Sequence, residues 1–172
     1  MKYFQVLLIL FFGFSSTAFT QISNVTKTFN NTQARLNLNA ALELEIDSEN
    51  DVSFNFLTSS DIENGIVKSQ FTRFKIKATV PWVLNIKAQT PYFNTSGRHA
   101  SNDMPASVLG IKKNNNTDFI PITFSDMSLS SGGRGDVFAS GNDFTADIKF
   151  TPGFQYGEGY YYITLVYTLT AM

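Results

Sequence analysis

Phe74 to Ala88 read FKIKATVPWVLNIKA, with apolar residues at every second position on either side of Pro81. A period of two is typical of a strand that buries one of its faces. Proline cannot donate a hydrogen bond to a sheet, so Pro81 indicates a bend or an edge position between two strands. The stretch therefore predicts one strand over residues 74–80 and a second over residues 82–88.

The same alternation recurs in other parts of the chain. Leu36 to Ile46 carries an apolar residue at every even position, and we interpret it as a half-buried strand despite its helix-favouring leucines and glutamates. From Tyr160 to Thr170 the odd positions are apolar or tyrosine, and most even positions are tyrosine or threonine. The other expected strands cover residues 53–56, 109–111, 120–124 and 144–150.

The segments between these runs have the composition of turns and loops. We expect no helix in them; they cover residues 47–51, 59–65, 89–105, 112–118, 125–143 and 151–159. Two of them, 89–105 and 125–143, exceed the usual length of connections, as functional or flexible loops do. About eight short strands with one-sided apolar faces predict an all-β fold: an antiparallel two-sheet β-sandwich of Ig-like or Greek-key type with long loops.

The first 20 residues have the layout of a secretory signal peptide. Lys2 precedes an almost wholly apolar run from Phe4 to Phe14, and small residues follow it. Cleavage after Thr20 or after Ala18 fits this pattern, and we prefer the first, which leaves residues 21–172 as a single β-sandwich domain. The alternative, an uncleaved membrane anchor, conflicts with an apolar run shorter than the roughly 20 residues that a span needs. We therefore expect a secreted, cell-surface or periplasmic protein without a transmembrane anchor.

The composition excludes several kinds of chemistry. The chain has no cysteine, so disulfides and lipid attachment through an N-terminal cysteine are excluded. Without Lys2, 12 basic and 14 acidic side chains remain, and no basic cluster is present that would neutralise nucleic-acid phosphates. His99 is the only histidine, and its surroundings suggest neither a hydrolase triad nor a zinc site. We expect a non-enzymatic protein without a cofactor or a nucleic-acid partner.

One acidic segment is a candidate for a calcium site. Asp47, Glu49 and Asp51 alternate in a predicted turn, where their carboxylates could face one ion. The spacing departs from the EF-hand pattern, because Val52 and Thr58 stand where that loop needs its glycine and its bidentate glutamate. The alternative interpretation is a solvated acidic turn.

Several aromatic residues are candidates for ligand binding. Tyr160 and Tyr162 lie on the face opposite the apolar face of the last strand, and other aromatic residues lie in predicted loops. Exposed rings can stack on sugars or on a protein partner, whereas the alternative role is packing between sheets and loops. The candidate ligand-binding residues are Trp82, Tyr92, Phe93, Tyr156, Tyr160 and Tyr162.

A possible adhesion tripeptide lies in the predicted loop over residues 125–143. Arg134, Gly135 and Asp136 form the sequence that some integrins bind, and serine and glycine precede it. A motif of three residues also arises by chance, so the alternative is an ordinary solvated loop.

Two short motifs resemble those of the WxL-type surface domains of bacteria. Trp82-Val83-Leu84 has the Trp-x-Leu pattern in mid-domain, and Tyr167-Thr168-Leu169 stands in the last strand, where that family has a second Trp-x-Leu. Tyr167 in place of the second tryptophan is a departure from the family pattern. Gly159-Tyr160 before the last strand is similar to the secreted β-sandwiches of the pilin and spore-coat-U type. The resemblance implies non-catalytic attachment at a cell surface, to peptidoglycan or another glycan.

Three hypotheses about function follow. The first is a secreted or cell-surface β-sandwich with a structural, adhesion or envelope-attachment role, whose partner is a cell-envelope glycan or a surface protein. The second is a carbohydrate- or peptidoglycan-binding module that uses exposed aromatic residues. The third is a subunit of a surface polymer, in which an edge strand of one copy pairs with another copy.

Overall fold

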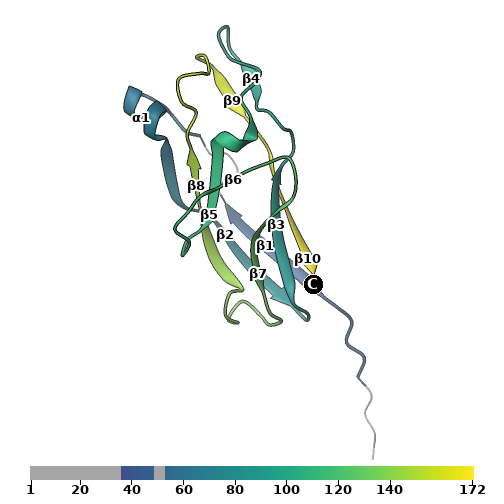
Figure 1. Ribbon diagram of the computed structural model, residues 1–172. Helices are drawn as coiled ribbons and strands as arrows, with labels where there is room; N and C mark the ends of the chain where they lie inside the picture. The colour runs from purple at the N-terminus through teal and green to yellow at the C-terminus, as the bar shows by residue number, and fades with distance from the viewer. Residues whose placement is uncertain (1–35, 49–52) are drawn as a thin grey trace, which may run out of the picture. The chain divides into compact units, whose positions relative to one another are not determined.

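The computed structural model describes residues 36–48 and 53–172 (Figure 1). The predicted signal peptide lies outside the described residues, and so do Glu49 and Asp51 of the acidic segment. The fold described below is that of the compact unit Leu38–Met172. Within the described residues, no helix is both long enough and apolar enough to cross a membrane.

Strands dominate this unit, and their pairings are antiparallel. The strands are β1 (Leu42–Ser48), β2 (Ile66–Ala78), β3 (Trp82–Ala88), β4 (Asn94–Ser96), β5 (Leu109–Lys113), β6 (Ile120–Pro121), β7 (Met127–Gly132), β8 (Asp143–Phe150), β9 (Tyr160–Tyr162) and β10 (Leu165–Ala171). Two short helical segments accompany them, α1 (Ser59–Asn64) and the 3-10 turn η1 (Ala106–Val108). The predicted all-β, antiparallel fold is confirmed.

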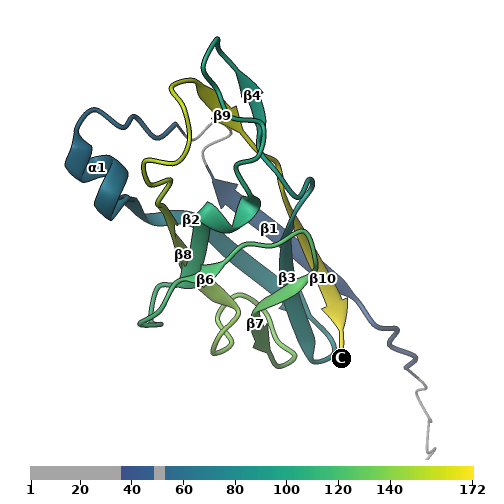
Figure 2. The same ribbon diagram turned by 45° about the horizontal axis from the view of Figure 1, so that its top comes forward.

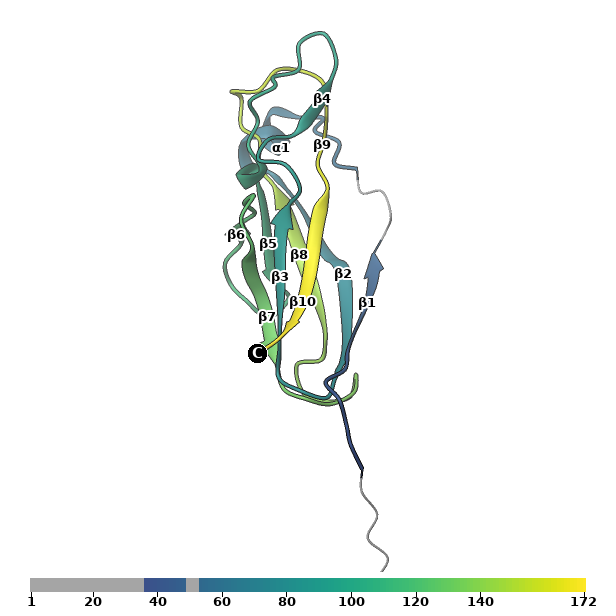
Figure 3. The same ribbon diagram turned by 90° about the vertical axis from the view of Figure 1, so that its right-hand side faces the viewer.

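The strands form two larger sheets and a small ribbon. One sheet has the order β1-β2-β8-β5-β6, the other has the order β10-β3-β7, and the ribbon pairs β4 with β9. The two larger sheets lie face to face, and the ribbon extends beyond one end of them (Figures 1 and 3). Helix α1 lies outside the sandwich and contributes no buried residue (Figure 2).

The core lies between the two larger sheets. Phe74 of β2 packs on Phe144 of β8, with ring centroids 5.1 Å apart, and also on Tyr167 of β10 at 5.0 Å, so this group of rings joins both sheets. Trp82 and Leu84 of β3 are fully buried in the same cluster. Burial of apolar area of this kind supplies the main stabilisation of a domain without disulfides.

The structure differs from the sequence-based prediction in several segments. The first strand begins at Leu42 rather than at Leu36, and Leu38 is 75% exposed. Residues 53–56 form no strand, although Phe54 and Phe56 pack edge-on against Phe150. The predicted loop over residues 125–143 contains β7, which pairs with β3.

Helix α1 occupies a segment that the composition predicts to be a loop. Thr58 caps it: the Thr58 hydroxyl accepts a hydrogen bond from the Asp61 backbone N–H at 3.1 Å, and the Asp61 carboxylate accepts one from the Thr58 N–H at 2.8 Å. The hydrogen bonds from Thr58 hold the pKa of the Asp61 carboxyl below its usual range. Thr58 followed three residues later by an acidic residue is the sequence signal that indicates this start.

Asp147 on the outer face of β8 is buried, although the apolar alternation over residues 144–150 predicts a solvent-exposed side chain there. Asp147 is only 8% exposed. A bulge in β2 between Lys68 and Thr72 brings the backbone N–H of Gln70 to 2.8 Å from Asp147 Oδ1, and Gln70 adopts a φ of 52°. Lys112 Nζ lies 3.6 Å from the other carboxylate oxygen. Asp147 therefore acts as a structural group that holds the bulge.

Candidate binding surface

The ribbon of β4 and β9 carries a row of exposed tyrosine and polar side chains. Its register places Asn94 opposite Tyr162 and Ser96 opposite Tyr160. Partners that lie directly opposite each other in a ribbon point to the same face. This face is open to solvent, since Tyr160 is 79% exposed and Tyr162 is 60% exposed. The two tyrosines thus lie where the alternation predicts them, away from the apolar face of the last strand.

An open hollow of about 440 Å³ lies beside this row. Tyr92, which is half exposed, and Tyr162 both line it. Asn94, Thr95 and Asn102 add amide and hydroxyl groups to its walls, and the Thr95 hydroxyl donates a hydrogen bond to Asn102 Oδ1. We call Tyr92, Asn94, Tyr160 and Tyr162 the tyrosine surface. It combines flat apolar rings with hydrogen-bonding groups that can both donate and accept.

Tyr161, between the two exposed tyrosines, holds the ribbon end together from the other face. Its hydroxyl accepts a hydrogen bond from the Ser101 N–H at 3.0 Å and donates one to the Gly157 carbonyl. The Gly157 N–H in turn donates to Ser101 Oγ at 2.9 Å. Gly157 lies so close to the His99 carbonyl that a Cβ would collide with it. These contacts tie the chain before β9 to the chain after β4, so the tyrosine surface has a fixed support.

The other aromatic candidates lie inside the molecule. Trp82 is fully buried, and its Nε1–H donates to Asn142 Oδ1 at 3.1 Å. Phe93 is buried and stacks on Phe150 with ring centroids 5.3 Å apart. Tyr156 is half-buried against the core. Trp82 and Tyr156 lie away from the hollow, which corrects the set chosen from the sequence, whereas Phe93 also lines the hollow although its ring is buried.

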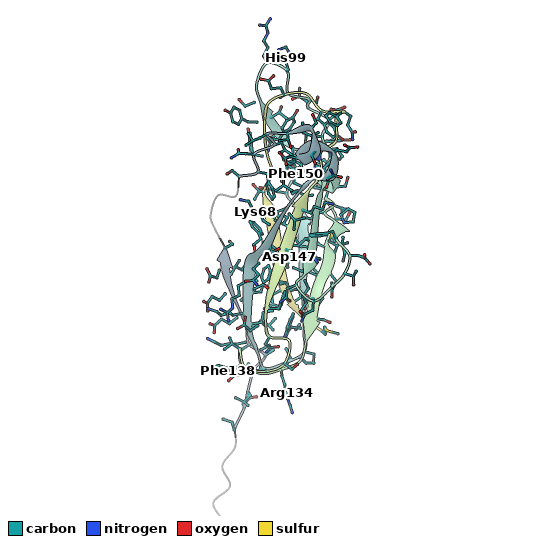
Figure 4. All side chains as sticks on the ribbon, turned by 90° about the vertical axis from the view of Figure 1, so that its left-hand side faces the viewer. Lys68, His99, Arg134, Phe138, Asp147 and Phe150 are labelled. Atoms are coloured by element: carbon teal, nitrogen blue, oxygen red, sulfur yellow. The ribbon has the colours of Figure 1, made fainter. Side chains whose placement is uncertain are left out.

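The Arg-Gly-Asp tripeptide lies at the opposite end of the sandwich from the ribbon (Figure 4). Arg134 and Asp136 are exposed. Gly135 exchanges two backbone hydrogen bonds with Ala78, at 2.8 and 2.9 Å, and Asn142 Nδ2 donates to the carbonyls of Gly135 and Asp136. The tripeptide is therefore anchored to the sheet at its central residue.

Within the part of the chain that the structure describes, the acidic and histidine candidates do not form one site. Asp47 belongs to β1, and its two predicted calcium partners lie outside the described residues. His99 is exposed at the ribbon end of the molecule (Figure 4). Within the described residues, no group of three or more His, Cys, Asp or Glu side chains is placed to hold a metal ion.

A larger hollow of about 920 Å³ lies over β2 and β8, beside the bulge. Its walls include Arg73 and Asp143, which are joined by two hydrogen bonds of 2.6 and 2.8 Å. The hydrogen bond from Arg73 holds the pKa of the Asp143 carboxyl below its usual range, and the same pair raises the pKa of Arg73. The two charges therefore pair with each other across the wall of this hollow.

The two motifs that resemble WxL-type domains lie side by side in the three-stranded sheet. Leu84 of β3 is opposite Leu169 of β10, and Tyr167 is opposite Ile86. Tyr167 is half-buried, and burial raises the pKa of its phenol. Both motifs therefore contribute to core packing. A comparison with protein-family models and with curated proteins gives no match to this chain.

Proposed function

We propose that this protein is an exported, non-catalytic β-sandwich that attaches to a carbohydrate of the cell envelope through its tyrosine surface. The observation that carries the proposal is the placement of Tyr92 and Tyr162 on one open hollow with Asn94. A structural or adhesion role without catalysis also fits the pairing of Arg73 with Asp143 and the exposure of His99 to solvent.

The chemistry of the tyrosine surface suits sugars. A pyranose ring has apolar C–H faces that stack on tyrosine, and its hydroxyl groups exchange hydrogen bonds with amides and phenols. Tyr160 and Tyr162 are more exposed than the other tyrosines of the ribbon end, so their rings can meet a flat polymer without a conformational change. An open surface of this kind fits a long or insoluble glycan better than a small free sugar.

The Tyr162→Ala variant is expected to lose retention on the insoluble glycan that the wild type binds. The assay is co-sedimentation of the purified protein with peptidoglycan, chitin, cellulose or xylan at graded concentrations. We expect the affinity to fall by about tenfold, which corresponds to about 1.4 kcal/mol, and to fall further in the Tyr160→Ala/Tyr162→Ala double variant. The loss has a physical reason: each alanine removes a ring on which a sugar stacks.

The matched control is Phe138→Ala. Phe138 is also an aromatic residue, it is 92% exposed, and it lies at the other end of the sandwich (Figure 4). This variant should bind as the wild type does. Wild-type protein that sediments with none of the four polymers, or equal losses in Phe138→Ala and Tyr162→Ala, would contradict the proposal.

Export is tested separately, by cell fractionation and N-terminal sequencing. We expect the mature chain to begin at Gln21 and to be found outside the cytoplasm, because residues 1–20 have the charge and apolar layout that the export machinery recognises. A full-length chain confined to the cytosol would refute the export part of the proposal and leave the sugar-binding part to be judged on the sedimentation assay.

A further inference from the structure

The five-stranded sheet ends at β1 among the residues that the structure describes. β1 pairs with β2 along its whole length, from Leu42 opposite Ala78 to Ser48 opposite Thr72. In Figure 3, β1 lies at the margin of its sheet, with β2 on one side. The outer edge of such a strand presents backbone N–H and C=O groups that can pair with a further strand.

The solvent face of β1 is a column of three carboxylates: Glu43, Glu45 and Asp47. β2 places a basic residue opposite each of them: Lys77, Lys75 and Arg73. Glu43 and Glu45 form ion pairs of 2.8 and 2.7 Å with the two lysines, and each uses its Oε1. Both side chains are more than half exposed, so their second oxygens can accept a hydrogen bond from another side. The hydrogen bond from Lys75 lowers the pKa of Glu45, which favours the charged form of this carboxyl group.

The opposite face of β1 is apolar and incompletely covered. Leu42 and Leu44 are half-buried, and Ile46 is 39% exposed. A strand added at this edge would place its own inward side chains beside these three residues and remove them from water. A strand that pairs with β1 would therefore be complementary to it if it carried basic residues on one face and apolar residues on the other.

From this charge pattern we infer that the outer edge of β1 binds an extended segment of a partner protein in which lysine or arginine alternates with apolar residues. β2 shows the pattern that fits, since Arg73-Phe74-Lys75-Ile76-Lys77 is what β1 already pairs with on its inner edge. Pairing of β1 with β1 of a second copy is disfavoured, because it would set carboxylates beside carboxylates. The site on β1 uses no residue of the tyrosine surface. Peptide binding at β1 can therefore be tested independently of sugar binding.

The probe is a labelled peptide with the sequence of residues 72–78, TRFKIKA, and its control is the same peptide with R73E, K75E and K77E. Fluorescence anisotropy with the purified full chain should show binding of the basic peptide and at least tenfold weaker binding of the acidic one. Binding should weaken as salt is raised from 0.05 to 0.5 M, because exposed charges are screened. Hydrogen exchange should show protection of the amides of residues 42–48 by the basic peptide.

A charge-reversal variant and the oligomeric state of the free protein provide two further tests of this inference. The E43K/E45K variant, with its folded state verified by its thermal unfolding transition, should prefer the acidic peptide; if it does not fold, hydrogen exchange of the wild type decides. Equal affinity for both peptides, or protection that leaves residues 42–48 unchanged, would overturn the inference. So would sedimentation that shows a dimer of the free protein with β1 protected, because the occupant would then be a second copy.

Discussion

Trp82→Ala is expected to lower the free energy of unfolding by about 3–5 kcal/mol, the usual cost of removing a buried tryptophan. Trp82 has no solvent-accessible surface. Its ring lies against Gly132 of the neighbouring strand β7, so close that a Cβ on Gly132 would collide with it. A cavity of that size cannot close, because Gly132 offers no side chain to fill it. Urea unfolding followed by circular dichroism measures the loss.

The Trp82→Phe variant separates packing from hydrogen bonding. Phenylalanine keeps most of the apolar contact but has no N–H to donate to Asn142 Oδ1, so its loss should be clearly smaller than that of alanine. Phe138→Ala serves as the exposed control and should change stability by no more than about 0.5 kcal/mol. A loss below about 1 kcal/mol for Trp82→Ala would mean that the ring does not fill the core as described.

Asn142→Leu is the second change with a large expected effect. Asn142 is fully buried just before β8, although a loop composition surrounds it. Its Oδ1 accepts from Trp82, and its Nδ2 donates to the carbonyls of Gly135 and Asp136 at 3.1 and 3.0 Å. Leucine has a similar volume but leaves the buried Trp82 N–H unpaired, at a cost of about 1–3 kcal/mol, whereas the Asp136 carbonyl still accepts from the Ala139 N–H.

The same substitution should loosen the loop that carries the Arg-Gly-Asp segment, although the two backbone hydrogen bonds between Gly135 and Ala78 remain. We expect faster proteolysis within residues 133–141 together with the loss of stability, because Asn142 is what joins this segment to Trp82. Asn116→Leu, in an exposed turn, is the control. In a double-mutant cycle, Trp82→Phe and Asn142→Leu should be less than additive, since both remove one shared hydrogen bond. Additive losses would show that the two residues act separately.

The two anchors explain how one chain presents distinct surfaces at its two ends. Trp82 and Asn142 fix the end that carries Arg134 and Asp136. At the other end, the hydrogen bonds of Tyr161 fix the ribbon that carries Tyr160 and Tyr162. In both places a buried or half-buried polar group supports exposed side chains. Sugar retention and any adhesion through the tripeptide can therefore be tested by mutations that leave the opposite end intact.

The strand content and the inward faces follow from the sequence, because a period of two is a local property. The alternation from Phe74 to Ala88 correctly predicts β3 and the second part of β2, which begins earlier, at Ile66. The same alternation fails from Leu36 to Ala41, because a strand also needs a partner. β2 ends at Ala78, opposite Leu42, and the chain then turns at Pro81 toward β3, so no ladder remains for the residues before Leu42.

The sites themselves depend on contacts between residues far apart in the chain. Tyr160 and Tyr162 are expected to be exposed from their positions in the last strand, but only the pairing of β9 with β4 brings Asn94 and Tyr92 to them. The alternation of acidic residues in β1 is visible in the sequence, whereas the position of β1 at the edge of its sheet is decided by the strand order. Local patterns determine which side of a strand faces water. The neighbours that share this side are decided only when the sheets assemble, because pairing partners lie as far apart in the chain as Trp82 and Ala171.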